Sequence, residues 1–126
     1  MEDKILTDTS VLINLQKAEE KTVKLFDKFK NEIIISRVTA YELIYGSKNN
    51  REKGINKKFL EMLSILEINE AISKYTYYLL DKYNLAMKLG IADALIASSS
   101  IVYGITLWTL NTRHFSKIKE LKLFKP

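Results

Sequence analysis

Short apolar runs alternate with longer stretches of mixed polarity along this chain. The apolar runs predict strands at residues 4–7, 33–35, 64–68 and 105–110, with a further edge strand at 121–124. Helical spacing and capping residues predict helices at 11–16, 19–30, 37–46, 56–63, 70–83 and 90–103. Strands that alternate with helices favour right-handed crossovers, so we expect a parallel sheet with helices on both faces.

Three segments add detail to this prediction. Residues 33–35 are consecutive isoleucines, which is typical of a strand buried on both faces. Residues 48–54 form a polar run that ends in Gly54, which is typical of a loop within one domain. In the last predicted helix, small and apolar residues at helical spacing indicate close packing: Ile91, Ala94, Leu95, Ser98 and Val102. Gly104 is expected to end that helix.

The composition is that of a globular protein and excludes several kinds of chemistry. The chain has 126 residues, 47% hydrophobic and 28% charged, as expected for one domain spanning 1–126. It contains no cysteine, which excludes disulfides, thiolate zinc sites and a cysteine nucleophile. The single histidine, His114, excludes paired-histidine catalysis and multi-histidine metal sites.

The charge balance suggests the kind of partner. Twenty Lys and Arg residues against 15 Asp and Glu give a net charge of +5, which favours a polyanion or an acidic protein. The charged N-terminal residues lack the apolar core of a signal peptide. The longest apolar stretch, residues 94–108, contains serines and is too short to cross a bilayer. We therefore expect a cytoplasmic protein that does not associate with membranes.

Four polar residues occupy positions where the predicted sheet would bring them together. Asp8 ends the first strand, and Glu42 lies in the helix after the second. Asp93 lies in the first turn of the small-residue helix, and Asn111 follows the strand at 105–110. Because the carboxyl ends of parallel strands share one edge of the sheet, we expect these side chains to converge there.

Gathered carboxylates repel one another, and their pKa values rise unless a cation neutralises them. Mg²⁺ and Mn²⁺ suit oxygen ligands of this kind. Such an ion lowers the pKa of a bound water and stabilises the charge that develops on a phosphodiester during attack. The pattern therefore predicts metal-dependent phosphodiester hydrolysis.

Each acid also has a simpler interpretation. Asp8 suits the cap of the following helix, and Asp93 suits a first helical turn, where the helix dipole favours an acid. Glu42 is harder to explain in this way. It shares helical spacing with Val38, Tyr41 and Tyr45, where a hydrophobic residue would be expected.

Four segments around these residues resemble the PIN-domain ribonucleases, in particular the VapC-type toxins of toxin–antitoxin pairs. They are TDTSVLI at 7–13, SRVTAYEL at 36–43, GIADALIA at 90–97 and TLNTRHF at 109–115. They occur in the family's order, and the resemblance extends from about residue 5 to residue 123. It implies a three-layer α/β/α sandwich with a central, mainly parallel sheet of four or five strands.

The resemblance also implies an endoribonuclease that depends on Mg²⁺ or Mn²⁺. It makes Asp8, Glu42 and Asp93 catalytic metal ligands. The fourth catalytic position, acidic in many relatives, falls on Asn111, and the lost charge weakens the case for a second metal. The family's hydroxyls near the site correspond to Ser10 and Thr109.

Several basic and aromatic residues are candidates for contact with RNA. The basic candidates are Arg37, Lys48, Arg51, Arg113 and His114, for which a solvated surface role is the alternative. His114 stands where relatives often carry Asp, and it either lines the rim of the site or caps the last helix. Tyr75, Tyr77, Tyr78 and Tyr83 suit base stacking or, alternatively, a helix with one core face and one interface.

The resemblance implies a role and a set of partners. The expected role is the toxin of a type II toxin–antitoxin system, with RNA as substrate and a cognate antitoxin as inhibitor. A homodimer or a toxin–antitoxin hetero-oligomer is expected. The alternatives are a PIN nuclease of RNA processing and a non-catalytic RNA-binding module, the latter because Asn111 weakens the site.

Overall fold

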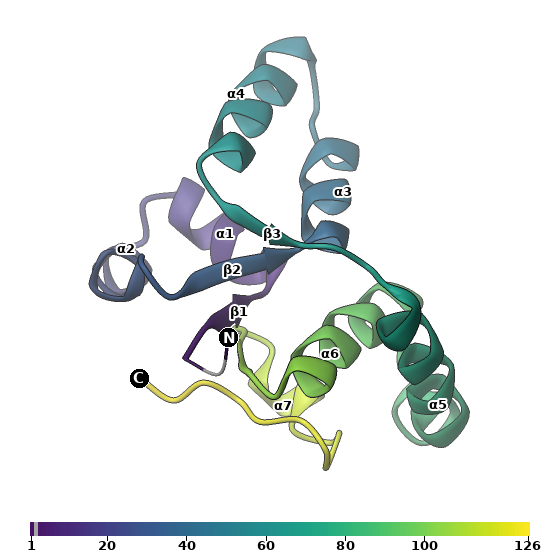
Figure 1. Ribbon diagram of the computed structural model, residues 1–126. Helices are drawn as coiled ribbons and strands as arrows, with labels where there is room; N and C mark the ends of the chain where they lie inside the picture. The colour runs from purple at the N-terminus through teal and green to yellow at the C-terminus, as the bar shows by residue number, and fades with distance from the viewer. Residues whose placement is uncertain (2) are drawn as a thin grey trace.

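The computed structural model describes Met1 and residues 3–126. Four strands in this part of the chain form one parallel sheet in the order β3-β2-β1-β4 (Figure 1). The strands are β1 (Ile5–Thr7), β2 (Ile33–Ser36), β3 (Ser64–Leu66) and β4 (Thr106–Trp108). The helices are α1 (Thr9–Gln16), α2 (Glu20–Phe29), α3 (Arg37–Tyr45), α4 (Asn50–Glu61), α5 (Glu70–Met87), α6 (Ile91–Tyr103) and α7 (Thr112–Phe115).

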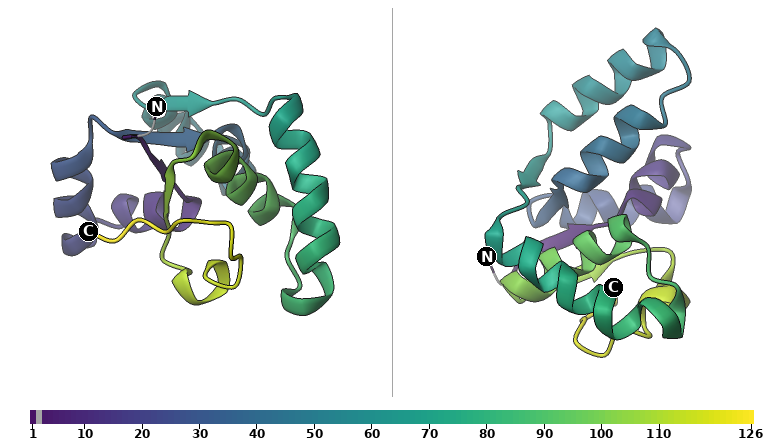
Figure 2. Two further views of the ribbon diagram at one scale, coloured as in Figure 1. Left: turned by 60° about the horizontal axis from the view of Figure 1, so that its bottom comes forward. Right: turned by 90° about the vertical axis from the view of Figure 1, so that its right-hand side faces the viewer.

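The sheet is buried on both faces, as its isoleucine-rich strands predict. Leu6 and Ile34 point to one face, where they pack with buried side chains of α5 and α6. Ile33 and Ile35 point to the other face and pack with residues of α1, α2, α3 and α4. The α5–α6 pair and the α1–α2 pair therefore lie on opposite sides of the strands (Figures 1 and 2). The predicted three-layer α/β/α sandwich with a parallel sheet is confirmed.

The small residues of α6 allow it to pack between the sheet and α5. Ala94, Ala97 and Ser98 are completely buried. Ile91, which the helical spacing placed on the packed face, is instead 68% exposed. That expectation is wrong because Ile91 opens the helix at the carboxyl edge of the sheet, where the covering layer ends. Gly104 does end the helix, with a φ of 66° that favours glycine.

The polar run at 48–54 is not the predicted loop, because α4 already begins at Asn50. The side chain of Asn49 caps the helix by accepting a hydrogen bond of 2.8 Å from the backbone of Glu52. Gly54 lies within the helix on its exposed side, where a side chain would meet nothing within 4 Å. A mid-helix glycine costs about 1 kcal/mol and does not break a well-capped helix.

The segment at 121–124 lies where the predicted edge strand would be, beside β4, but it forms a single bridge between Leu107 and Leu123. Leu107 donates a hydrogen bond of 2.9 Å to the carbonyl of Lys122 and accepts one of 2.8 Å from Phe124. The side chain of Phe124 then points inward, and the centre of its ring lies 5.0 Å from that of Phe29. The sheet therefore has four strands and one additional bridge.

The hairpin formed by α3 and α4 extends away from the sheet, as the right-hand view of Figure 2 shows. In the described part of the chain, no helix combines the length and apolar character needed to cross a membrane.

Candidate active site

Asp8 is the most deeply buried acid at the carboxyl edge of the sheet, with 4% of its surface exposed. It directly follows β1 and occupies the N-cap position of α1, but its side chain makes no capping hydrogen bond. Instead, its Oδ2 accepts hydrogen bonds from the hydroxyls of Ser10, at 2.8 Å, and Thr109, at 2.7 Å. The carboxylate is thus fixed by hydroxyls rather than used as a helix cap, and Oδ1 is the oxygen left for another partner.

The same two hydroxyls connect Asp8 to the loop after β4. The backbone N–H of Leu110 donates to Ser10 Oγ at 3.1 Å, and that of Asn111 donates to Thr109 Oγ1 at 3.0 Å. The sheet edge therefore joins two segments about a hundred residues apart through side chains that the sequence had marked as site hydroxyls.

Glu42 lies on α3, half-buried and facing α1. The hydroxyl of Thr9 donates to its Oε1 at 2.6 Å, and the hydroxyls of Thr9 and Thr39 are also hydrogen-bonded, at 3.0 Å. Sequence reasoning missed Thr9. Its place beside Asp8 in the TDTS segment was a signal, but only the packing of α1 against α3 shows that it contacts Glu42.

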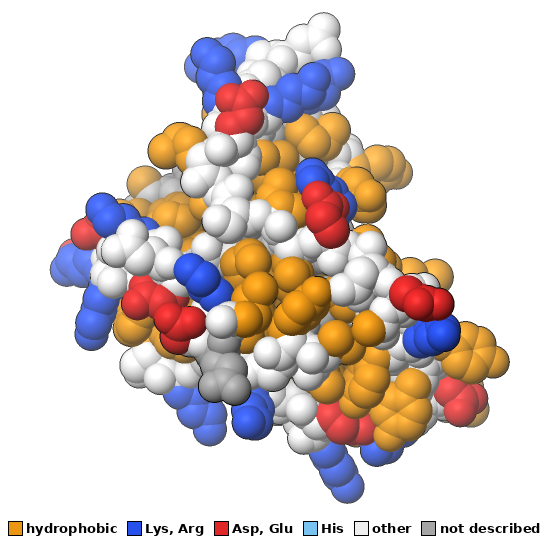
Figure 3. All heavy atoms as spheres, viewed as in Figure 1, with side chains coloured by type: hydrophobic (Ala, Val, Ile, Leu, Met, Phe, Trp, Pro, Cys, Tyr) orange, Lys and Arg blue, Asp and Glu red, His pale blue; other side chains and the backbone are white. Residues whose placement is uncertain are grey.

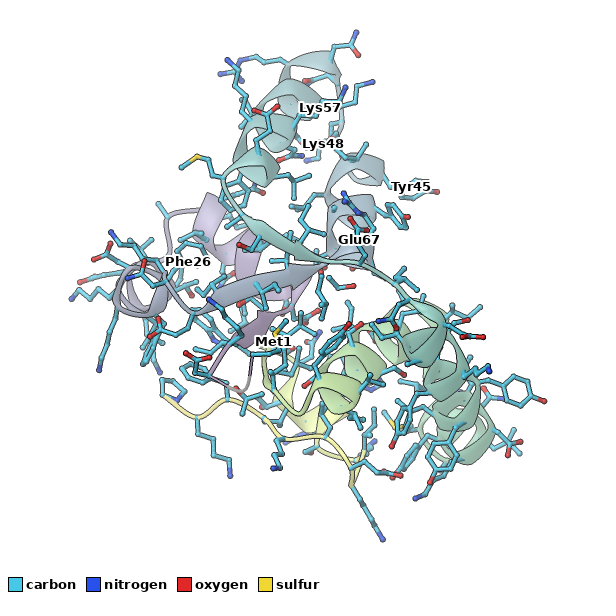
Figure 4. All side chains as sticks on the ribbon, viewed as in Figure 1. Met1, Phe26, Tyr45, Lys48, Lys57 and Glu67 are labelled. Atoms are coloured by element: carbon cyan, nitrogen blue, oxygen red, sulfur yellow. The ribbon has the colours of Figure 1, made fainter. Side chains whose placement is uncertain are left out.

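The prediction that Glu42 lies among buried apolar side chains is wrong for its two tyrosine neighbours. Tyr41 is 60% exposed and Tyr45 is 94% exposed. Figure 4 shows Tyr45 pointing away from the body of the molecule. Of the set at helical spacing only Val38 is buried, because α3 lies at the edge of the sheet and its outer face meets solvent.

Asp93 and His114 form a second part of the site. Asp93 lies in the first turn of α6 and is partly exposed, and the Nε2 atom of His114 lies 3.4 Å from its Oδ2. His114 thus faces an acid of the site from α7. Asn111 occupies the N-cap position of α7 and is exposed, and its side chain makes no capping hydrogen bond.

The acids share one electrostatic field. Burial raises the pKa of Glu42, and the charges of Asp8 and Asp93 raise it further against the opposing hydrogen bond from Thr9. Burial also raises the pKa of Asp93, and the charge of Asp8 adds to this effect while His114 opposes it. A site with this charge repels further anions and attracts cations.

The chemistry of these donors fits a hard divalent cation that keeps some of its water. Carboxylate and amide oxygens are suitable ligands, and Mg²⁺ usually retains several waters when bound. Among the residues that the structure describes, no three His, Cys, Asp or Glu side chains lie close enough to form a ready-made metal cluster.

A groove of about 740 Å³ leads away from the site between α1 and the α3–α4 hairpin. Thr9 and Glu42 line the end nearest the site. Lys17 and Lys48 line the groove together with apolar side chains such as Ile55.

The predicted RNA-binding residues differ in their surroundings. Arg37 makes a two-fold hydrogen-bonded ion pair with Glu67, including one bond of 2.9 Å, so its charge is already compensated. Lys48 and Arg51 are exposed on the hairpin, and Arg113 is exposed on α7. Lysine and arginine side chains gather at the top of Figure 3, over α4, and Figure 4 labels Lys48 and Lys57 in this region.

The tyrosine series is divided between the core and the surface. Tyr83 is buried and donates to Glu120 at 2.6 Å, and Tyr78 donates to the same carboxylate at 3.1 Å. Tyr77 is 78% exposed. The core face of this helix is therefore confirmed, and both base stacking and a protein interface stay predictions for its exposed tyrosines.

Comparison with known proteins decides the family. Residues 5–121 match the PIN domain family. The chain belongs to that family. The resemblance drawn from the four sequence segments is confirmed.

Among curated relatives, this PIN domain is 36% identical to Ribonuclease VapC1 of Methanocaldococcus jannaschii, over 97% of this chain and 86% of that protein. It is 30% identical to Ribonuclease VapC1 of Rickettsia felis, over 94% of this chain and 93% of that protein.

Two solved structures share its fold over almost the whole chain. DNA-bound VapBC from Salmonella typhimurium matches with a TM-score of 0.84 and 22% identity, over 98% of each chain. VapBC2 from Rickettsia felis bound to a promoter DNA fragment matches with a TM-score of 0.82 and 25% identity, over 95% of this chain and 96% of that one.

Proposed function

We propose that this PIN domain is a metal-dependent endoribonuclease and the toxin of a type II toxin–antitoxin pair. The observation that carries the proposal is the gathering of three acids, Asp8, Glu42 and Asp93, at the carboxyl edge of the sheet, where burial and the charge of Asp8 raise the pKa values of Glu42 and Asp93. Relatives that cover the whole domain and are named as ribonucleases support the activity.

Asp8 and Asp93 would hold a Mg²⁺ or Mn²⁺ ion, partly through water. When bound, that ion supplies Lewis-acid activation of water and stabilises the charge on the phosphodiester. Glu42 orients the attacking water, since Thr9 fixes one of its oxygens and leaves the other free to accept a hydrogen bond. The amide of Asn111 donates to a phosphate oxygen of the substrate. Ser10 and Thr109 keep the Asp8 carboxylate in one orientation.

The substrate class is RNA. The net charge of +5 suits a polyanion, and Lys48, Arg51 and Arg113 are exposed cations that would hold phosphates near the site. A further relative, 27% identical, is named tRNA(fMet)-specific endonuclease VapC of Shigella flexneri. His114 would border the scissile phosphate through its contact with Asp93.

The partner is a cognate antitoxin, and the solved VapBC complexes support this assignment. We expect the chain to act in the cytoplasm, as a homodimer or in a hetero-oligomer with its antitoxin.

The test compares the wild-type chain with Asp8→Asn on RNA, with Mg²⁺, with Mn²⁺ and with EDTA. We expect cleavage only with a divalent ion, and a loss of roughly 100-fold or more in Asp8→Asn, because it removes a charge from the centre of the acid set. Asp81→Asn is the matched control, because Asp81 is exposed on α5. Equal activity of Asp8→Asn and wild type would contradict the proposal. RNA binding without cleavage by the wild type would instead indicate a non-catalytic RNA-binding module.

A further inference from the structure

A buried amide joins three helices next to the candidate active site. Asn56 lies in the middle of α4 and is 5% exposed. Its Oδ1 accepts a hydrogen bond of 2.7 Å from Nε2 of Gln16, the last residue of α1. Its Nδ2 donates to the carbonyl of Leu43 at 3.1 Å and to the hydroxyl of Ser47 at 2.8 Å. Both donor hydrogens and the acceptor oxygen of the amide are therefore used.

The hydrogen bonds of Asn56 fix the spacing between α4, α1 and the end of α3, which a side chain that only fills space would not do. Leu60, one turn further along α4, is the other buried side chain of that helix in the described structure, and it packs into the apolar core. A leucine at position 56 would bury apolar area without needing partners, whereas an amide is tolerated there only when its hydrogen bonds are made. The amide thus requires α1 and the end of α3 at fixed positions relative to α4.

The three helices that it joins form the walls of the groove described above. Gln16, Leu43 and Asn56 all line that groove of about 740 Å³, and Glu42 is the residue next to Leu43. The hairpin extends from the body of the molecule (Figure 2). Because the groove lies between this hairpin and α1, the contact between them sets the width of the groove.

The groove suits a single strand of RNA. It is continuous with Thr9 and Glu42 of the candidate site. The charged residues of its lining are Lys17 and Lys48, which can contact phosphates, and Glu42 and Glu52, while apolar side chains such as Phe59 offer surface for bases.

We propose that Asn56 is a positioning residue, which holds the α3–α4 hairpin against α1 and so keeps the groove open for an RNA strand that enters the active site. This inference rests on the proposed function, because it assigns the groove to the same substrate. Asn56 itself does not touch the reacting atoms.

The experiment measures kcat and KM for Asn56→Leu on an RNA long enough to fill the groove and on a dinucleotide that is too short to reach it. Because Asn56→Leu removes all three hydrogen bonds of the amide, including the one that ties α4 to α1, we expect KM for the long RNA to rise about fivefold to tenfold. The dinucleotide should be cut with unchanged kcat and KM. Backbone amides of α4 should exchange hydrogen faster than in wild type.

Asn84→Leu is the matched control, since Asn84 is exposed on α5, and it should change none of these quantities. Gln16→Leu removes only the bond to α1 at an exposed position, so it decides the question if Asn56→Leu does not fold. It should raise KM for the long RNA about threefold and loosen α4 in hydrogen exchange.

The two proposals fail in different ways. A wild-type chain that does not cut RNA would contradict the proposed function. An active wild type, with unchanged KM in both Asn56→Leu and Gln16→Leu, would overturn the role of Asn56 alone. An equal loss on long and short substrates would also overturn it, because a general structural defect does not depend on substrate length.

Discussion

Two partly buried carboxylate sites in this molecule have opposite electrostatics. Burial raises the pKa of Glu120, but hydrogen bonds from Tyr83, Lys82 and Tyr78 outweigh it and bring the pKa down to about 2. Glu42 is also desolvated, yet its charged neighbours are Asp8 and Asp93, so its pKa is raised.

The difference separates a structural acid from one suited to chemistry. Glu120 is surrounded by donors and stabilises the fold by joining α5 to the segment after α7. Glu42 accepts a hydrogen bond from one hydroxyl, that of Thr9, and lies near the like charges of Asp8 and Asp93. Binding of a cation or a proton there relieves the repulsion between the carboxylates. Perturbed acids of this second kind concentrate at functional sites.

Of the variants that test this comparison, Glu42→Gln should have the largest effect. The glutamine keeps an oxygen for Thr9 but removes the charge, so we expect kcat on RNA to fall by about 100-fold with little change in folding. Steady-state kinetics and a urea titration measure the two effects. Glu61→Gln is the control, as Glu61 is an exposed acid on α4. Full activity in Glu42→Gln would show that Glu42 does not take part in catalysis.

Glu120→Gln should do the reverse. Loss of the charge weakens hydrogen bonds from Lys82 and two tyrosines, and bonds to charged groups contribute about 1.5–3 kcal/mol each, so we expect a loss of about 2 kcal/mol in the free energy of unfolding. Chemical denaturation measures it, and RNA cleavage by the folded protein should stay unchanged. A variant as stable as wild type would show that this cluster does not hold the fold together.

Thr9 should show a smaller effect on activity. Thr9→Val removes the hydroxyl that orients Glu42, and we expect kcat to fall by about tenfold, whereas Thr9→Ser should stay within about twofold of wild type. The comparison of the two variants in single-turnover cleavage isolates the hydroxyl. Equal loss in both would assign the effect to packing instead.

The smallest effect is the pH dependence of stability, measured in EDTA. The folded-state pKa of Glu42 is raised, so the penalty of its charge is present above that pKa and is relieved as pH falls through it. At pH 7, Glu42→Gln should therefore be slightly more stable than wild type in chemical denaturation, and this gain should vanish as the pH approaches the ordinary range of a glutamate.

Glu120 gives the opposite sign and another pH window. Its folded-state pKa is about 2, so the stability that it contributes is present above its unfolded value and is lost as pH falls from about 4.5 toward 2. A Glu120→Gln difference that persisted down to pH 2 would contradict the assignment.

Local sequence features made much of the fold and part of the candidate site predictable. The consecutive isoleucines of β2 indicated a strand buried on both faces, and Asp8 and Asp93 were placed at one sheet edge by the ends of predicted elements. The same reasoning wrongly predicted a loop at the start of α4. The helix begins there because the side chain of Asn49 caps it, and a polar run with a capping residue has the same composition as a loop.

The sequence by itself determined the periodicity of the strands and helices and the places of the acids at element ends, because these depend on neighbours within a few residues. The alternation of strands and helices along the chain then favoured the parallel topology, since crossovers between parallel strands are right-handed. Only the tertiary structure decided that Thr9 orients Glu42, that Glu120 finds Lys82, and that Asn56 joins Gln16 to the end of α3. Those pairs lie 33, 38 and 40 residues apart, and no local pattern specifies which polar side chains meet once the layers pack.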